Sequence, residues 1–209
     1  MSKSKFNYKV YNGKTLKTYF ENSRILLLTV FFVTGIITGA IILNKDSGIT
    51  EKIFDFINKS VISKSGQGIN EIFINSLLSN ILFFAVNIFF AFSLIGYPLV
   101  MWLPFLKGLG LGAVIGYLYI YYGLTGLGYT VLTLVPGATV SVFALITACN
   151  SSCEYSKNAY SKAIIGKGQF EKGETKIFLI KQLIYICICA ASSMTDALFS
   201  TIFLRFFEL

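Results

Sequence analysis

The chain has 209 residues, of which 55% are hydrophobic, 16% aromatic and only 13% charged. A soluble domain carries about 25% charged residues, so this composition indicates an all-α integral membrane protein and excludes an ordinary soluble fold. The formal net charge is +8. Most lysines stand between apolar stretches, which favours anionic lipid headgroups and membrane topology, rather than nucleic acid, as the reason for the charge.

No histidine occurs in the chain. This absence removes His-based acid–base chemistry, His metal ligands and the Ser–His or Cys–His nucleophile pairs. Intramembrane proteolysis would otherwise need two facing aspartates, and Asp196 is the only acid well inside an apolar stretch. The four cysteines form no CxxC motif. We therefore expect no catalytic residues, no metal and no cofactor, and we do not expect an enzyme.

The N-terminal region predicts a basic cytoplasmic tail followed by a first membrane span. Residues 1–24 hold six basic side chains and one acid, and residues 25–43 then run without a charge. Nineteen residues make a helix of about 28 Å, which is long enough to span. Gly35 and Gly39 form a GxxxG pattern, which predicts close packing of this span against another helix.

A long loop, residues 44–71, separates the first two spans. Within it, residues 52–62 place isoleucines and a valine on one helical face. This pattern predicts a short helix that lies either on the membrane surface or over the outer ends of the spans.

The second span is predicted over residues 72–95. It contains three amide side chains, which are expected to hydrogen-bond to neighbouring helices because unpaired amides are unfavourable in lipid. These are Asn75, Asn80 and Asn87. Gly96 and Pro98 follow the span and predict a break in the helix.

The next stretch holds Pro104 and Lys107 within apolar sequence, and it allows two interpretations. Residues 97–122 could be one long kinked span with Lys107 near its middle. Alternatively, 97–107 is a re-entrant or broken segment and only 108–122 spans; we favour this interpretation because it keeps the lysine out of mid-depth. The span carries glycines at every fourth position, which predict another close helix contact. These are Gly108, Gly112 and Gly116.

The last two spans are predicted over residues 127–148 and 177–204. Pro136 lies inside the first of them and predicts a kink. The final span carries Lys181 near one end and Asp196 nearer the other. Residues 25–204 thus form a single domain of five transmembrane helices.

Charge counts predict the orientation. The N-terminal tail and the 150–176 loop hold 6 + 5 = 11 basic residues, whereas the 44–71 loop and the C-terminal end hold 4 + 1 = 5. The positive-inside rule therefore places the N-terminus in the cytoplasm and the C-terminus outside.

The polar residues inside the spans are candidates for function as well as for packing. Asp196 has Ser192, Ser193, Thr195 and Ser200 near it in sequence, so a polar network is expected, with ion or partner binding as the alternative. For Lys107 we expect an interfacial, snorkelling position, with a functional contact as the alternative. The glycine faces are expected to pack helices, and homo-oligomerisation through them stays open.

Several stretches together resemble the stage II sporulation protein M family over residues 18–204. These are FFVTGIITGAIILN, the GYP turn, FLKGLGLGAVIGYL and TLVPGATVSVFALITA. The wider family often has a Pro-His-Gly…Glu pattern in the fourth span. Here Pro136 remains, but Gly137 replaces the histidine and Ser141 stands at the glutamate position. Any activity that depends on those polar groups is therefore not expected in this chain.

The resemblance implies a membrane anchor in engulfment, located at the sporulation septum and the engulfing membrane. Its implied partners are membrane lipid and the stage II D and P sporulation proteins, which remodel and degrade peptidoglycan. The alternative is a small transporter or permease component, because broken helices near Pro104 and Pro136 and a buried lysine are features of substrate pathways.

Overall fold

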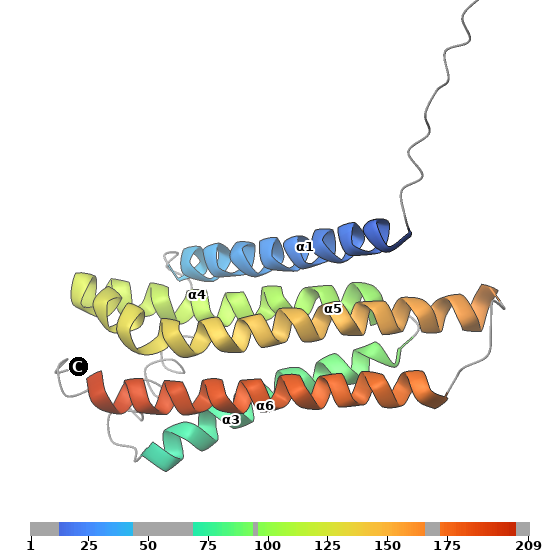
Figure 1. Ribbon diagram of the computed structural model, residues 1–209. Coiled ribbons are helices and arrows are strands. Elements are labelled where there is room, and N and C mark those ends of the chain that lie inside the picture. Colours follow the sequence, from blue (N-terminus) through green and yellow to red (C-terminus); the bar gives the residue numbers. More distant parts are fainter. Residues whose placement is uncertain (1–12, 44–68, 94–95, 166–171, 204–209) are drawn as a thin grey trace, which may run out of the picture.

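The computed structural model describes residues 13–43, 69–93, 96–165 and 172–203, and these residues form helices without a strand. The expected short helix at 52–62 lies outside the described residues. In chain order the elements are α1 (Gly13–Ile42), α3 (Ile69–Ala91), α4 (Gly96–Tyr129), the π-helix η1 (Thr130–Leu134), α5 (Val135–Ile165) and α6 (Lys172–Phe203) (Figure 1). The predicted all-α membrane fold is confirmed.

By length and apolarity the described residues contain four candidate membrane-spanning stretches, against the five spans predicted. They are Ser23–Ile42, Ile69–Ala91, Gly96–Lys162 and Gly173–Ile202. The third has 67 residues, about 100 Å as a straight helix, which is far more than one crossing needs. It contains both α4 and α5: the backbone leaves the helical conformation at Gly123 (φ 57°, ψ −132°), and α5 runs back alongside α4 in the opposite direction (Figure 1). This one stretch therefore covers the spans predicted at 108–122 and 127–148.

The preferred interpretation of residues 97–107 as a re-entrant segment is wrong. α4 runs as a helix from Gly96 to Gly123 through both Pro104 and Lys107. Pro98 lies in its first turn, where a proline removes no intrahelical hydrogen bond. The break predicted at Gly96 and Pro98 lies before this helix, where the Gly96 amide donates to the Ser93 carbonyl at 3.0 Å.

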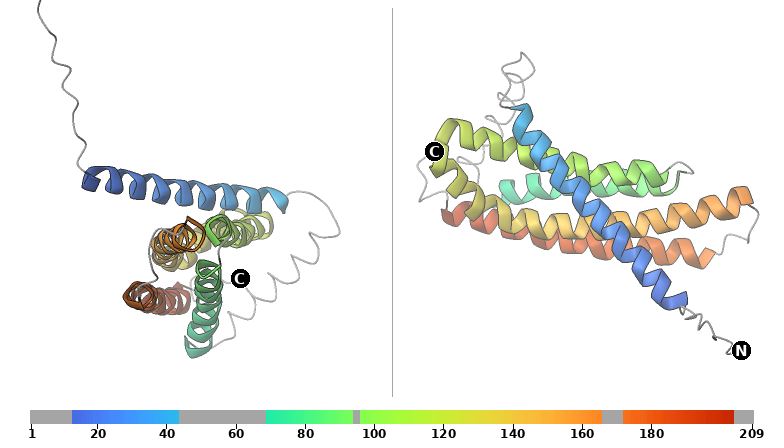
Figure 2. Two further views of the ribbon diagram at one scale, coloured as in Figure 1. Left: turned by 90° about the vertical axis from the view of Figure 1, so that its right-hand side faces the viewer. Right: turned by 90° about the horizontal axis from the view of Figure 1, so that it is seen from above.

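The helices form three layers. In the end-on view α1 lies across one side, α4 and α5 form the middle, and α3 and α6 form the far layer (Figure 2). α1 contacts α4 and α5, whereas α3 contacts α4, α5 and α6. In the contacts between α1 and α4 described below, the residue numbers rise along both helices together, so the two helices are parallel. By the same criterion α3 is antiparallel to α4 and to α6, and α5 is antiparallel to α6.

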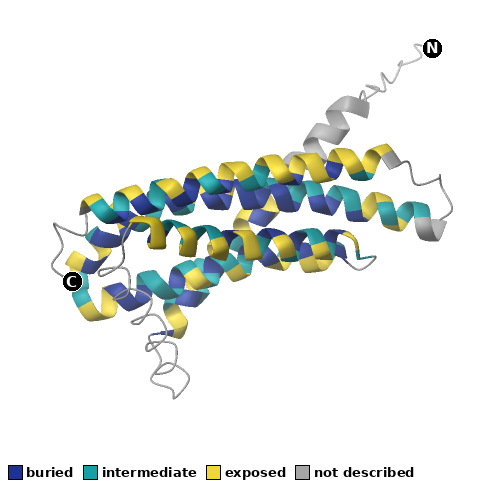
Figure 3. Cartoon of the chain, turned by 90° about the horizontal axis from the view of Figure 1, so that it is seen from below, coloured by how far each residue is buried: buried dark blue, intermediate teal, exposed yellow. Residues whose placement is uncertain are grey.

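The exposed surface is strongly apolar. Many large hydrophobic residues are exposed, including Leu124 at 82% and Phe89 at 74%. Exposed positions recur along the helices in Figure 3. Several buried positions are polar instead, among them Asn87, Gln182 and Ser193. Such an arrangement suits a bundle whose outer surface faces lipid and whose polar groups are satisfied inside.

Candidate functional site: a buried polar layer

The five glycines singled out in the sequence lie at one interface, between α1 and α4. A Cβ on Gly35 or Gly39 of α1 would collide with a backbone carbonyl of α4, from Phe105 or Leu109 respectively. In the other direction, a Cβ on Gly112 would collide with the Ile36 carbonyl. Gly108 similarly meets Phe32, and Gly116 meets Ala40 at 3.2 Å. Backbone meets backbone here, so only a residue without a side chain fits at the centre of the contact.

The predicted break residues occupy two kinds of position. Gly96 begins α4, and a Cβ there would collide with the Phe90 carbonyl of α3. Pro104 is buried inside an uninterrupted helix. Pro136 follows directly on η1, where the Val135 amide donates to the Thr130 carbonyl five residues back. The helix thus has a wider, π-helical turn with one extra residue just before the proline, and such a turn can accommodate a local bend.

Lys107 points into the bundle, not toward the headgroups as expected. Its Nζ donates to Asn80 Oδ1 at 2.7 Å and lies 4.8 Å from the centre of the Phe83 ring, both on α3. Its place in the helix is about 16 Å beyond Gly96. The ammonium is therefore held inside the span by an amide oxygen and an aromatic face, which together replace part of its hydration.

Asp196 of α6 is the carboxylate whose charge acts on this lysine. Its Oδ2 accepts a hydrogen bond from Ser76 Oγ of α3 at 2.8 Å. Its other oxygen packs so closely on Gly137 of α5 that a Cβ at Gly137 would overlap the carboxylate. The opposite charge of Asp196 attracts the Lys107 ammonium. Gly137, where the resemblance noted a missing histidine, provides the space that this carboxylate fills.

These groups meet at one level and join four helices. Asn80 connects Lys107 of α4 with Ser193 of α6. Its Nδ2 donates to Ser193 Oγ at 3.2 Å, and its Oδ1 accepts the hydrogen bond from Lys107. Ser192 Oγ donates to the Gly137 carbonyl at 2.9 Å and ties α6 to α5. We call Ser76, Asn80, Lys107, Ser193 and Asp196 the polar layer.

The sequence analysis named hydroxyl groups close to Asp196 in the chain as its expected neighbours. Two of these make hydrogen bonds to other groups: Ser193 bonds Asn80 and the Cys189 carbonyl, and Thr195 bonds the Ser192 carbonyl. A donor to the carboxylate that was not named is Ser76, which lies 120 residues earlier in the chain. Because Ser76 belongs to a different helix, no local pattern in the sequence identifies it.

A second buried contact, which the sequence analysis missed in part, lies nearer the α5–α6 loop. Asn87 Nδ2 of α3 donates to Gln182 Oε1 of α6 at 3.2 Å. Gln182 Nε2 in turn donates to the Ala148 carbonyl at 3.2 Å and to Ser152 Oγ at 3.1 Å, both on α5. Asn87 had been noted as an amide inside a span. Gln182 could have been found by the same criterion, because it follows Lys181 in an apolar segment.

Lys181 does not join these contacts, because it is exposed on the outer face of α6. Among the described residues, no group of three or more His, Cys, Asp or Glu side chains could hold a metal ion. The chemical capacity of the polar layer is therefore charge neutralisation and helix cross-linking inside the membrane. It has one cation, one carboxylate and amide and hydroxyl groups that bridge them.

Comparison with known proteins identifies the family of the chain. No curated protein and no solved structure matches the chain. The family described as stage II sporulation protein M matches residues 28–203, which includes the glycine interface and the whole polar layer. The chain therefore belongs to the stage II sporulation protein M family and is a multi-span membrane protein of that sporulation family.

Proposed function

We propose that the protein is a non-enzymatic membrane scaffold of the engulfment machinery. It would anchor peptidoglycan-remodelling partners, the stage II D and P sporulation proteins, to the septal and engulfing membranes. The observation that carries this proposal is the family match over residues 28–203. The interior supports it, because the buried polar groups bond to one another across four helices, as a rigid anchor requires.

The proposed orientation places the N-terminus in the cytoplasm and the C-terminus outside. The end of the bundle near the α5–α6 loop carries Arg24 and four lysines among its described residues, against Glu154 and Glu174. These lysines are Lys157, Lys162, Lys176 and Lys181. The opposite end carries Glu71 among its described residues. This asymmetry supports a cytoplasmic location for the basic end.

Deletion of the gene in a spore-forming host tests the function. We expect the septum to form but the mother-cell membrane to stop advancing around the forespore, as seen by membrane-dye microscopy. A copy of the gene at a second site should restore engulfment. Normal engulfment in the deletion strain would contradict the proposal.

Co-purification tests the anchoring step. From sporulating cells, the tagged chain solubilised in mild detergent should retain the stage II D and P proteins, whereas a tagged membrane protein of unrelated family should not. The rival function, a transporter component, has the buried Lys107 in its favour. Solute flux in reconstituted vesicles that disappears on Lys107→Ala would favour that rival.

A further inference from the structure

Arg24 is a cation at the start of the apolar part of α1 with an unsatisfied buried atom. Its side chain is half-buried, and its Nε is buried without a hydrogen-bond partner in the described part of the chain. It lies near enough to Cys153 of α5 for its charge to act on that thiol. A buried donor without an acceptor costs about 1–3 kcal/mol, and more when it is charged, so the Nε is a hydrogen-bonding group of this guanidinium that the described part of the chain leaves unsatisfied.

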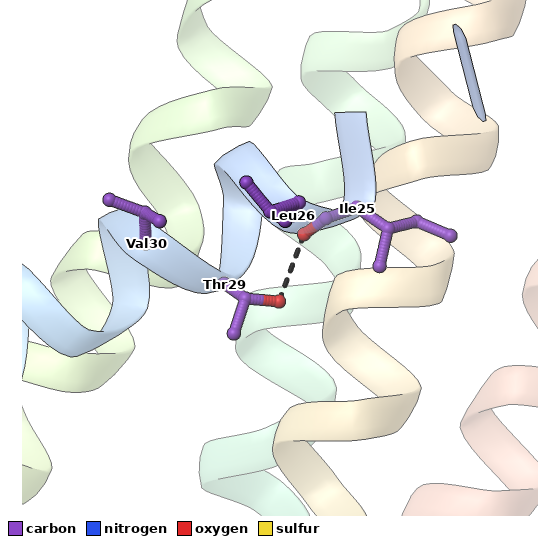
Figure 4. A pocket seen from close by; sticks show the side chains of 4 residues that line it. All are labelled: Ile25, Leu26, Thr29 and Val30. Atoms are coloured by element: carbon purple, nitrogen blue, oxygen red, sulfur yellow. Dashed lines mark hydrogen bonds between the residues drawn. The ribbon is translucent and has the colours of Figure 1, made fainter. Parts of the chain in front are cut away.

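An apolar hollow begins at the very next residue. Its lining is Ile25, Leu26, Thr29 and Val30, the residues drawn in Figure 4. Leu26 is 67% exposed and Val30 52% exposed. The Thr29 hydroxyl donates to the Ile25 carbonyl at 2.9 Å, so its hydrogen-bonding capacity is used within the helix. The hollow thus offers hydrocarbon contact along the first two turns of the span.

The surroundings of Arg24 favour an anionic ligand. Lys157, Lys176 and Lys181 are exposed at the same end of the bundle. Lys162 is paired with Glu174 at 2.5 Å, and Glu154, next to Cys153, is half-buried with a partner of its own. The exposed cations therefore outnumber the unpaired carboxylates at this end, and the local field attracts negative charge.

We propose that this is a binding site for an anionic phospholipid, with the phosphate on the Arg24 guanidinium and an acyl chain in the hollow. A guanidinium presents a donor fork that fits phosphate oxygens. The hollow lies inside the span, where its natural occupant is a hydrocarbon chain. A free phosphate would satisfy Arg24 but would leave the hollow unfilled, so the two sources of phosphate can be separated by experiment.

The test measures lipid binding to the full chain in neutral detergent by native mass spectrometry. Phosphatidylglycerol and phosphatidylcholine with the same acyl chains are the two lipids. We expect the wild-type chain to retain phosphatidylglycerol in preference to phosphatidylcholine. We expect Arg24→Gln to weaken the binding of phosphatidylglycerol about tenfold, because the variant loses a charged hydrogen bond to the phosphate. Thr29→Phe, which fills the hollow, should weaken binding of both lipids.

Lys181→Gln is the matched control, because it removes a cation from the same end without touching the hollow. Preference for phosphatidylglycerol should persist in this variant. The proposal is overturned if Arg24→Gln binds as wild type, or if Lys181→Gln loses as much binding as Arg24→Gln, which would indicate a diffuse charge effect. It is also overturned if inorganic phosphate competes fully with the lipid, because the acyl chain would then contribute nothing.

Discussion

Lys107 and Asp196 are opposite charges inside one membrane bundle, and each reduces the penalty of the other. Removing one member leaves the other charge uncompensated, which costs about 3–5 kcal/mol in a fully buried ion pair and less here, because both side chains are half-buried. We therefore expect Lys107→Met or Asp196→Asn alone to lower the thermal unfolding temperature in detergent by many degrees. The double variant should recover most of that loss, because neither charge then remains.

A double-variant cycle followed by thermal unfolding measures this coupling. If the losses of the two single variants simply add in the double variant, the two charges act independently and the interpretation of the polar layer is wrong. Asn80→Leu serves as a further comparison, since Asn80 bonds to both Lys107 and Ser193. It should weaken the bundle without removing a charge.

Gly137 is expected to tolerate no side chain as long as Asp196 is present. A Cβ there would overlap the Asp196 carboxylate, so Gly137→Ala must either displace this carboxylate from its contact with Ser76 or push α6 away from α5. Overpacking of this kind costs about 1–3 kcal/mol. Adding Asp196→Ser should restore part of the lost unfolding temperature by freeing the space. No recovery in Gly137→Ala/Asp196→Ser would show that the strain lies elsewhere.

At the scale of elements, the α1–α4 interface permits a comparison within one helix. Gly112→Ala should destabilise the protein by about 1–3 kcal/mol, because its Cβ would collide with the Ile36 carbonyl. Gly110→Ala, two residues away, meets nothing within 4 Å and should stabilise α4 by up to about 1 kcal/mol through helix propensity. The two variants are compared by heating each in detergent to a series of temperatures and measuring the folded fraction by fluorescence-detected gel filtration. If Gly112→Ala and Gly110→Ala changed the unfolding temperature equally, the close packing at Gly112 would not contribute to stability.

The glycine pattern and the all-helical character could be read from the sequence because each depends on local spacing. Gly108, Gly112 and Gly116 share a face wherever a helix forms. The interpretation of residues 97–107 was wrong because it kept Lys107 out of mid-depth, whereas in the structure a continuous helix carries Lys107 into the bundle. Its partner Asn80 comes from another helix, and no local pattern in the sequence connects the two.

The same limit applies to Asp196. Its contacts with Ser76 and Gly137 depend on how three helices meet, which periodicity does not encode. The boundary predicted between the spans at 108–122 and 127–148 depends instead on local sequence. In the structure the helical conformation is interrupted there, at Gly123.

At the scale of the whole molecule, the orientation can be tested with introduced cysteines. Lys157→Cys and Leu124→Cys, in a chain whose four native cysteines are replaced by alanine, place thiols at opposite ends of the bundle. We expect a membrane-impermeant maleimide to label Leu124→Cys in intact cells and Lys157→Cys only after permeabilisation. The reverse pattern would invert the proposed orientation and place the basic end outside.

The exposed aromatic residues of α4 suggest where the bilayer lies. Trp102 is 55% exposed, and Tyr119 and Tyr121 are 56% and 60% exposed. Trp102 lies about 26–29 Å along the helix from the two tyrosines, which is close to the hydrocarbon thickness of about 30 Å. Such residues prefer the headgroup level. Lys107 then lies about 8 Å inside the hydrocarbon boundary, which explains why its ammonium needs Asn80 and Asp196.

The polar layer also has a consequence for biogenesis. Ser76, Asn80 and Lys107 enter the bilayer on α3 and α4, but Ser193 and Asp196 arrive only with α6, which is synthesised later. Until then the half-made bundle holds a cation without this counter-ion. A nascent chain that stalls before residue 177 would therefore leave the Lys107 ammonium in the bilayer without the carboxylate that offsets part of its charge.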